Sequence, residues 1–370
     1  MKNKKILLVT TIIAISVGGI LVFNLIPQFE TTEFNQNSII KISEGSTTTI
    51  ELEGNPTTTI QEIEDEDLID IEQSEIEILL EYNSTTMISE QFVTYLLVGS
   101  DRRSEESSLS RGFVQGQRAD VIILALINRN DDSVSLVSIP RDLLIKNSCT
   151  QEIQRINSTF QKNDCGNSAE NLSANILNIT GLLVDHFALF TFEGFEQIID
   201  SLNGVEICLN QAQREGYSFE LNEGCQIVNG SVALNWVVSR NTEVLVGEKV
   251  LDKNGEDASE WKKMGGVSDL TRNERQQYVI LQLLKRLSDF QSLAELNNFI
   301  NTLEDSFVID DNLTLNNAIN TLWNFRNLDF SKINKHSIPT SAYELEDGRQ
   351  VLIISENFSL HAEEIGLISS

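Results

Sequence analysis

The chain has 370 residues and a formal net charge of −28, with 55 acidic against 27 basic residues. This length is ample for one large hydrophobic core with appended segments. The acidic balance argues against nucleic acid as a ligand, because binding to a phosphate backbone needs clustered Lys and Arg. The chain also has no G-x-S-x-G, Walker or H-E-x-x-H pattern, which argues against a serine hydrolase, an NTPase or a zinc protease.

The N-terminus carries an apolar run. Lys2, Lys4 and Lys5 precede residues 6–26, which contain no charge and as a helix would be roughly 30 Å long, about the thickness of a bilayer core. A cleaved signal peptide is the alternative, but its apolar run is usually shorter and ends at a small-x-small site, which is missing here. We predict that residues 1–29 form a short cytoplasmic segment and a retained transmembrane anchor. The lysines before the span place the remaining chain outside a cell membrane that it crosses once.

The next segment differs in composition. Residues 30–91 hold sixteen acidic residues and one lysine, with Thr and Ser runs and no sustained periodicity, which predicts a disordered acidic linker. Residues 92–290 are then predicted to form the main domain. Residues 291–370 are expected to be a C-terminal extension packed on that domain, with helices around 293–303 and 315–324 and a strand at 350–354.

Two apolar strands, residues 120–128 and 133–139, are separated by a polar turn. Near-continuous Val, Ile and Leu over this length is typical of strands buried on both faces, so we predict a hairpin in the middle of a sheet. A preceding apolar strand at 92–99 is expected beside it. Asp101 follows that strand and would then reach the same edge of the sheet.

Charged residues flank this hairpin. Arg118 and Asp120 enter its first strand two residues apart, so both side chains should leave from one face, and Arg141 and Asp142 follow its second strand. In an antiparallel pair the start of one strand lies beside the end of the other. Two arginines and two carboxylates are therefore predicted to meet at one edge, as an anion site with its own acid-base or metal-binding groups.

Helices and strands alternate in the following part of the chain. A helix is predicted at about 168–180, closed by Gly181, then a strand at 186–192, an amphipathic helix at 194–202 and a strand at 205–209. This alternation indicates the α/β class. We expect a three-layer α-β-α architecture with a mixed central sheet and helices on both faces.

The four cysteines form two local pairs. Cys149 and Cys165 are 16 residues apart, and Cys208 and Cys225 are 17 apart. Disulfides within these pairs are the simplest of three connectivities in an extracytoplasmic chain. A zinc site is the alternative, but no C-x-x-C occurs and the three histidines are scattered.

A second group of polar residues starts a helix predicted to begin at about residue 269. Arg272, Arg275 and Gln276 are three and four positions apart and so share a face, which continues as Val279 and Leu283. Either these polar groups point inward, at the helix end whose dipole favours anions, or they form an exposed network with Glu274. Spacing alone does not decide. Before this helix, residues 230–240 are predicted to be a short helix or strand that delivers Arg240, and residues 241–267 a surface insertion.

Six motifs carry a family resemblance. In order they are GSDRR at 99–103, RADVIIL at 118–124, SIPRD at 138–142, RIN at 155–157, GFEQIIDSLNGVEI at 194–207 and DLTRNERQQ at 269–277. Together they resemble the LytR-CpsA-Psr family of bacterial surface enzymes, which transfer glycopolymers from polyprenyl-pyrophosphate carriers to the cell wall. The similarity covers roughly residues 92–290 and agrees with the predicted anchor.

The resemblance implies roles for individual residues. Residues matching the family's pyrophosphate-binding positions are Arg118, Arg141, Arg240, Arg272 and Gln276, with Arg275 as the second arginine of the helix motif. Asp101 and Asp120 match carboxylates linked to Mg²⁺ or to proton removal, so these two residues with Arg118 and Arg141 are the expected catalytic group, and Mg²⁺ the expected cofactor. One departure from the family pattern matters, because Val238 stands where an arginine is usual. Arg155 also replaces a common lysine, which is a mild change.

The resemblance implies an anchored extracytoplasmic phosphotransferase that moves a glycopolymer from a polyprenyl-pyrophosphate carrier to a cell-wall or surface acceptor. Two alternatives stay open: a non-catalytic surface regulator that binds polyprenyl lipid, and a polyprenyl-pyrophosphate phosphatase with water as acceptor. A lipid donor requires an apolar groove. Phe195, Ile198, Val279 and Leu283 are possible lining residues, although ordinary core packing explains them better.

Overall fold

The structure is a computed structural model that describes residues 30–44, 91–100, 118–131, 133–161, 166–255, 257–264, 269–286, 289–303, 306–325, 329–345 and 347–368. The predicted membrane anchor and Asp101 lie outside these residues. Among the helices that are described, none combines the length and apolar character needed to cross a bilayer.

The central sheet has seven strands and a mixed topology. Their order is β1 (Glu30–Thr32), β14 (Phe307–Asp310), β7 (His186–Thr191), β2 (Phe92–Ser100), β3 (Ala119–Asn128), β4 (Val134–Ser138) and β15 (Asn334–Ser337). β2, β3 and β4 are antiparallel neighbours, whereas β2 runs parallel to β7 and β4 parallel to β15. The predicted hairpin, its position within the sheet and the mixed character of the sheet are confirmed.

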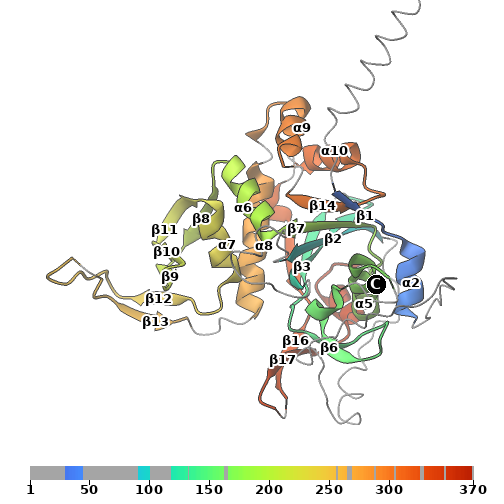
Figure 1. Cartoon of the computed structure of the whole chain (residues 1–370), viewed down its shortest axis with the longest axis horizontal. Helices are drawn as coiled ribbons and strands as arrows, with labels where there is room; N and C mark the ends of the chain where they lie inside the picture. Colours follow the sequence, from blue (N-terminus) through green and yellow to red (C-terminus); the bar gives the residue numbers. More distant parts are fainter. Residues whose placement is uncertain are drawn as a thin grey trace, which may run out of the picture.

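Helices cover both faces of this sheet (Figure 1). Alternate residues of β3 point to opposite faces, with Ile122 and Leu124 on one side and Ile123 on the other. The first face packs against α2 (Gln36–Ser43), α5 (Ser168–Thr180) and α11 (Phe358–Glu364). The second face is covered by α6 (Phe192–Ser201), α7 (Gly230–Val238), α8 (Asp269–Arg286), α9 (Leu293–Asn301) and α10 (Leu315–Phe325).

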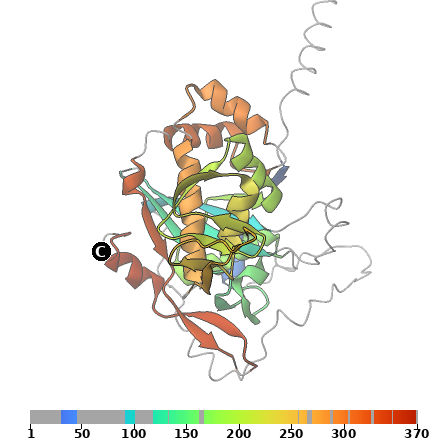
Figure 2. The same ribbon diagram turned by 90° about the vertical axis from the view of Figure 1, so that its left-hand side faces the viewer.

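Smaller elements surround these layers. A four-stranded sheet contains β9 (Gln213–Glu215), β10 (Phe219–Leu221), β12 (Glu243–Val246) and β13 (Glu260–Lys263), and Figure 2 shows it on the outer side of α8. The predicted surface insertion is therefore folded, as the hairpin β12–β13. Three further two-stranded sheets pair β5 (Leu144–Lys146) with β6 (Ile153–Arg155), β8 (Val205–Leu209) with β11 (Gly224–Val228), and β16 (Thr340–Glu344) with β17 (Gln350–Ile354). Two 3₁₀ turns complete the described elements, η2 (Ile156–Thr159) and η4 (Phe330–Lys332).

Part of the predicted linker belongs to the folded domain, and this boundary is corrected. β1 pairs in parallel with β14, and α2 packs on α5. Phe34, Ile39 and Ile42 are buried in the main core. The prediction was wrong because three apolar side chains among acidic and polar residues give only a weak local signal, while their burial depends on partners far along the chain.

The predicted C-terminal extension is likewise integral to the fold. Its helices and its strand at 350–354 are present, but β14 and β15 are strands of the central sheet itself. The proposed boundary at residue 290 therefore does not separate two packed units. β14 lies between β1 and β7, and β15 closes the opposite edge beside β4.

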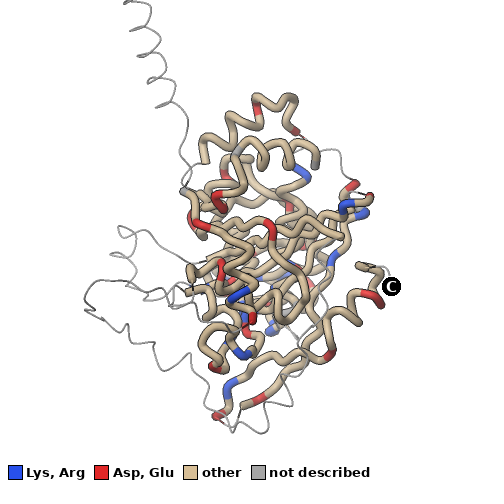
Figure 3. The backbone as a smooth tube through the Cα atoms, turned by 90° about the vertical axis from the view of Figure 1, so that its right-hand side faces the viewer, with Lys and Arg blue, Asp and Glu red and all other residues tan. Residues whose placement is uncertain are grey.

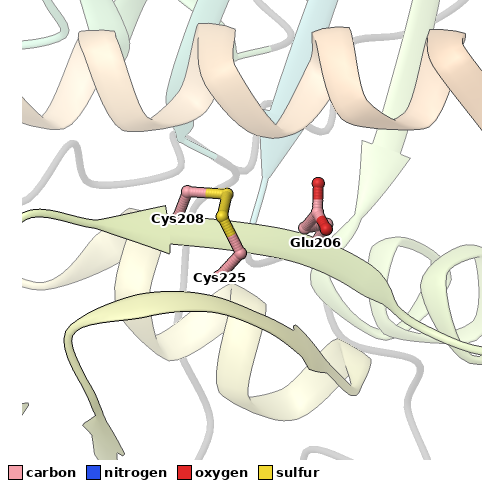
Figure 4. Close-up of side chains that lie close together, drawn as sticks. All are labelled: Glu206, Cys208 and Cys225. Carbon is pink, nitrogen blue, oxygen red and sulfur yellow. A yellow bond between two sulfur atoms is a disulfide. The ribbon is translucent and has the colours of Figure 1, made fainter.

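A disulfide joins Cys208 of β8 to Cys225 of β11, as predicted. The two cysteines are direct cross-strand partners, and Figure 4 shows them on the same side of the ribbon as Glu206. Cys149 is also disulfide-bonded, and its predicted partner Cys165 lies outside the described residues.

Candidate anion-binding site

The site begins at the end of the sheet where β3 starts and β4 ends. Gly99 pairs with Val121 and Ser100 with Ala119, so Asp120 is the extra residue of a β-bulge. A bulge turns a side chain away from the regular alternation of the strand. Arg141, which follows β4, donates a hydrogen bond from Nη1 to Asp120 Oδ1. The predicted meeting of these two hairpin ends is confirmed, although the bulge was not foreseen.

Asp142 is the second carboxylate of the site. Its Oδ2 lies 3.4 Å from Arg141 Nε and 3.9 Å from Arg272 Nη2, and its Oδ1 lies 3.5 Å from Arg155 Nε. The three guanidinium groups come from the end of β4, from β6 and from the first turn of α8. Arg141, Arg155, Arg272, Asp120 and Asp142 form what we call the charged cluster.

The charged cluster holds three permanent positive charges against two carboxylates. All five side chains are shielded from solvent to some degree, from 32% exposed at Arg155 to 6% at Arg272, and shielding strengthens charge interactions relative to bulk water. Over the chain as a whole, Figure 3 shows basic and acidic positions interspersed in its view rather than separated. The local excess of guanidinium groups therefore suits an anion with several oxygens, such as a phosphate.

Two other predicted anion ligands, Arg118 and Arg240, are not among the five residues of the charged cluster. Arg118 directly precedes β3 and is partly exposed. Arg240 lies two residues past the end of α7 and is exposed. α7 is a helix, which decides between the two predicted conformations, and it ends at Val238, so Arg240 is not part of it.

Arg275 does not belong to the charged cluster, which corrects its predicted role. Successive helical residues are 100° apart, so Arg275 and Gln276 leave α8 in clearly different directions. Arg275 is buried, donates hydrogen bonds to the Trp236 carbonyl, Thr242 Oγ1 and Gln213 Oε1, and lies over the Trp236 ring. Burial lowers the pKa of Arg275 to about 10, so it stays protonated at neutral pH. It joins α8 to α7 and to the four-stranded sheet.

An apolar cavity of about 340 Å³ lies between the second face of the central sheet and helices α6 to α10. Its lining includes Phe195, Ile198, Val279 and Leu283, the four residues for which a lipid groove or core packing had been considered. Three of them, Phe195, Val279 and Leu283, also belong to a hydrophobic cluster of this face or pack against it. These residues thus both line the cavity and take part in core packing.

The cavity is lined by residues that neighbour members of the charged cluster in the chain, although no member of the cluster lines it. Val121, which follows Asp120, and Gln276, one helical turn after Arg272, both line it, as does Gly99 opposite Val121. A Cβ atom on Gly99 would lie 2.9 Å from the Cβ of Val121, so glycine is what allows the two strands to approach this closely beside the bulge. At the other end of the same strands, Tyr95 and Ile127 are lining residues. The cavity therefore extends from the charged edge along β2 and β3.

Val238, the position where the sequence departs from its family pattern, lines this cavity and is partly buried. Its apolar side chain extends the cavity wall where an arginine was expected. Sequence reasoning noted the substitution but could not place it.

Few of the described residues are grouped closely enough to hold a metal ion together. Among those residues, two groups of side chains bring three possible ligand atoms together: Glu206 with Cys208 and Cys225, and Glu356 with His361 and Glu364. The first contains the disulfide, and neither contains Asp120. The predicted Mg²⁺ ligands therefore reduce here to Asp120, since Asp101 lies outside the described residues.

Sequence reasoning missed two contacts of the site. Arg155 was treated as a motif variant, yet it contacts Asp142, and Arg272 of α8 contacts the same carboxylate. The RIN motif that follows the hairpin was the available signal for Arg155. Four lining residues of the cavity were named from the sequence, but its full extent was not, because five helices distant in sequence enclose it.

Comparison with known proteins yields several relatives. A polyisoprenyl-teichoic acid–peptidoglycan teichoic acid transferase TagU of Halalkalibacterium halodurans is 22% identical over 54% of this chain and 58% of its own length. The cell wall biosynthesis protein LcpA of Corynebacterium glutamicum is 30% identical over 40% of this chain and 34% of its own. The chain thus spans less than two thirds of these curated relatives.

Two solved structures share the fold. A LytR-Csp2A-Psr enzyme from Actinomyces oris aligns with a TM-score of 0.55 at 22% identity, covering 76% of this chain and 92% of that one. A structure of TagT bound to LIIa-WTA aligns with a TM-score of 0.53 at 16% identity, over 77% and 96%. The family model of the LytR_cpsA_psr family matches residues 57–364. With that match across most of its length, the chain belongs to the LytR-CpsA-Psr family.

Proposed function

We propose that this protein is an extracytoplasmic transferase that moves a glycopolymer from a polyprenyl-pyrophosphate carrier to a cell-wall or cell-surface acceptor. The observation that carries the proposal is the adjacency of the charged cluster and the apolar cavity. A donor of this class has the same two parts, a doubly charged pyrophosphate and a hydrocarbon chain. The names of the relatives, teichoic acid transferases and cell wall biosynthesis proteins, support it.

The proposed reaction uses the charged cluster for positioning and charge neutralisation. An acceptor hydroxyl attacks the phosphorus that carries the glycan, a new P–O bond forms, and the bond to the polyprenyl phosphate breaks. Arg141, Arg155 and Arg272 neutralise the phosphoryl oxygens through paired N–H donors. A phosphate that takes over the Arg141 donors leaves the Asp120 carboxylate to accept the hydroxyl proton.

Mg²⁺ and membrane attachment complete the proposal. Mg²⁺ prefers carboxylate and phosphate oxygens, so Asp120 fits as one ligand and Asp101 is proposed as another. Bound there, the ion would neutralise further charge on the pyrophosphate. An anchor in residues 1–29 would hold the domain outside the membrane, close to a lipid-linked donor.

The transfer reaction has a direct test. The full-length protein is incubated with a synthetic polyprenyl-pyrophosphate sugar, with and without an oligosaccharide acceptor and Mg²⁺, and polyprenyl phosphate release is measured. We expect release that requires the acceptor, falls in the Arg141→Ala variant and persists in Arg129→Ala, which removes a half-exposed arginine that pairs with Asp185 and directly follows the opposite end of β3. Release without an acceptor would indicate a phosphatase.

One observation favours a second function. Val238 presents an apolar side chain to the cavity at the position of a usual arginine. A regulator that binds polyprenyl lipid without turnover would need the cavity but fewer cationic groups. Tight donor binding with no release under any condition would support this function and exclude the transferase.

A further inference from the structure

We infer that Asp142 is a positioning residue: its carboxylate holds Arg141, Arg155 and Arg272 in the arrangement that receives a pyrophosphate. This inference rests on the proposed function for the identity of the anion, but its structural part concerns the three arginines alone. Asp142 is the residue of the charged cluster whose carboxylate contacts all three guanidinium groups.

The distances favour positioning over tight pairing. Charge-assisted hydrogen bonds between guanidinium and carboxylate groups are usually about 2.7 to 2.9 Å long, whereas the contacts of Asp142 measure 3.4, 3.5 and 3.9 Å. Arg141 Nε and Arg155 Nε are buried and make no hydrogen bond within the described part of the chain. A guanidinium has five N–H donors, and Arg141 and Arg155 each donate one side-chain hydrogen bond within the described residues, so these two arginines keep donors for an incoming anion while the attraction of Asp142 limits how far they move.

Asp142 is itself held firmly. Its backbone carbonyl accepts a hydrogen bond from Leu352 N of β17, and Arg155 Nη2 donates to the Gln350 carbonyl of the same strand at 3.2 Å. Figures 1 and 2 both show the hairpin β16–β17 at the lower end of the molecule, and Leu143 bridges to Leu352 there. The C-terminal hairpin thus supports both members of the Asp142–Arg155 contact.

Two effects of the carboxylate on anion binding have opposite signs. As a negative charge beside the site, Asp142 repels a phosphate, and removing its charge should then strengthen binding. As the group that holds three like-charged guanidinium groups together, Asp142 offsets the electrostatic repulsion between them. Removing its charge should then weaken binding, because the three groups would move apart. The sign of the change in affinity therefore distinguishes a positioning role from simple repulsion.

The test compares the full-length wild-type protein with Asp142→Asn, which keeps the shape of the side chain and removes its charge. Asp289→Asn is the matched control, because it removes an exposed carboxylate paired with Arg286 outside the cluster. Calorimetry measures binding of inorganic pyrophosphate. Nuclear magnetic resonance of ¹⁵N-arginine-labelled protein measures the Nε–H signals of the three arginines without any ligand. Thermal unfolding checks that each variant is folded.

We expect Asp142→Asn to bind pyrophosphate roughly tenfold more weakly, by analogy with metal sites, where loss of a carboxylate that orients a ligand weakens metal binding by about this factor or more. The Nε–H signals of Arg141, Arg155 and Arg272 should broaden or exchange faster in the folded variant, and Asp289→Asn should change neither. Unchanged signals, or tighter pyrophosphate binding, would overturn the positioning role. Changed signals in a protein that binds no pyrophosphate even as wild type would keep the role and refute the proposed function.

Discussion

Arg272 and Arg275 lie three positions apart on one helix but have different surroundings. Arg272 contacts Asp142 in the charged cluster, whereas Arg275 donates hydrogen bonds to a backbone carbonyl and to two side-chain oxygens. If such a donor is removed, the buried acceptor oxygens are left without a hydrogen bond, which lowers the stability of the fold. We therefore propose a role in ligand binding for the first arginine and a role in stability for the second.

Arg275→Ala should lower the free energy of unfolding by about 2 to 4 kcal/mol, because it removes a buried charged donor and its three bonds. Lys285→Ala on the exposed face of the same helix is the control and should have a much smaller effect. Urea unfolding of the full-length protein measures both. A stable Arg275→Ala variant that loses pyrophosphate affinity would instead place Arg275 in the binding site.

Val238→Arg tests the main departure from the family pattern. Val238 lines the cavity, and an arginine at this position restores the positive charge that is usual there. We expect turnover in the polyprenyl phosphate release assay to rise severalfold. Val238→Met, which lengthens the side chain without charge, should not raise it. Turnover absent from the wild type and from both variants would favour the regulator.

At the scale of elements, the packing of α2 on α5 centres on one acidic residue. Glu170 of α5 accepts hydrogen bonds from Asn35 N and Ser38 Oγ, which ties the segment before the main domain to the core. Burial nevertheless dominates and raises the pKa of Glu170 above its usual value of 4.5. The folded protein therefore binds this proton more tightly than the unfolded chain does.

The sign of the pH dependence follows from linkage. A raised carboxyl pKa gives a contribution to stability that is complete below pH 4.5 and is lost as the pH rises through the folded value. Glu170→Gln keeps an acceptor for Asn35 N but cannot ionise. Its thermal midpoint relative to wild type should therefore increase from pH 4 to pH 8. A difference that stays constant, or one that decreases, would contradict the assigned pKa direction.

Elements with strong local signals were predictable. β2, β3 and β4 are near-continuous apolar runs, and α5 ends at Gly181 in the left-handed conformation that glycine favours. β1, β14 and β15 escaped prediction because they are three or four residues long and gain their stability from partners distant in sequence. Within the site, the Asp120–Arg141 pair followed from strand adjacency alone. The contacts of Asp142 with Arg155 and Arg272 required β6 and α8 to be placed in space.

At the scale of the whole molecule, the proposed anion site belongs to an acidic protein. The net charge of −28 opposes an anionic ligand at long range. Salt limits this repulsion to about 10 Å at 0.1 M, so contacts within the charged cluster decide binding. The apolar cavity adds a second source of affinity that salt does not weaken. A ligand that combines a pyrophosphate with a hydrocarbon chain uses both.

The central claim is that one ligand occupies the charged cluster and the cavity together. The most direct measurement compares the binding of a polyprenyl pyrophosphate, inorganic pyrophosphate and the uncharged polyprenol to wild type and to Arg141→Ala. We predict that the lipid pyrophosphate binds wild type most tightly and that Arg141→Ala weakens both pyrophosphates by the same factor, at least about tenfold, without affecting the polyprenol. Lipid pyrophosphate affinity that is unchanged in Arg141→Ala, or no higher than that of inorganic pyrophosphate, would contradict the claim.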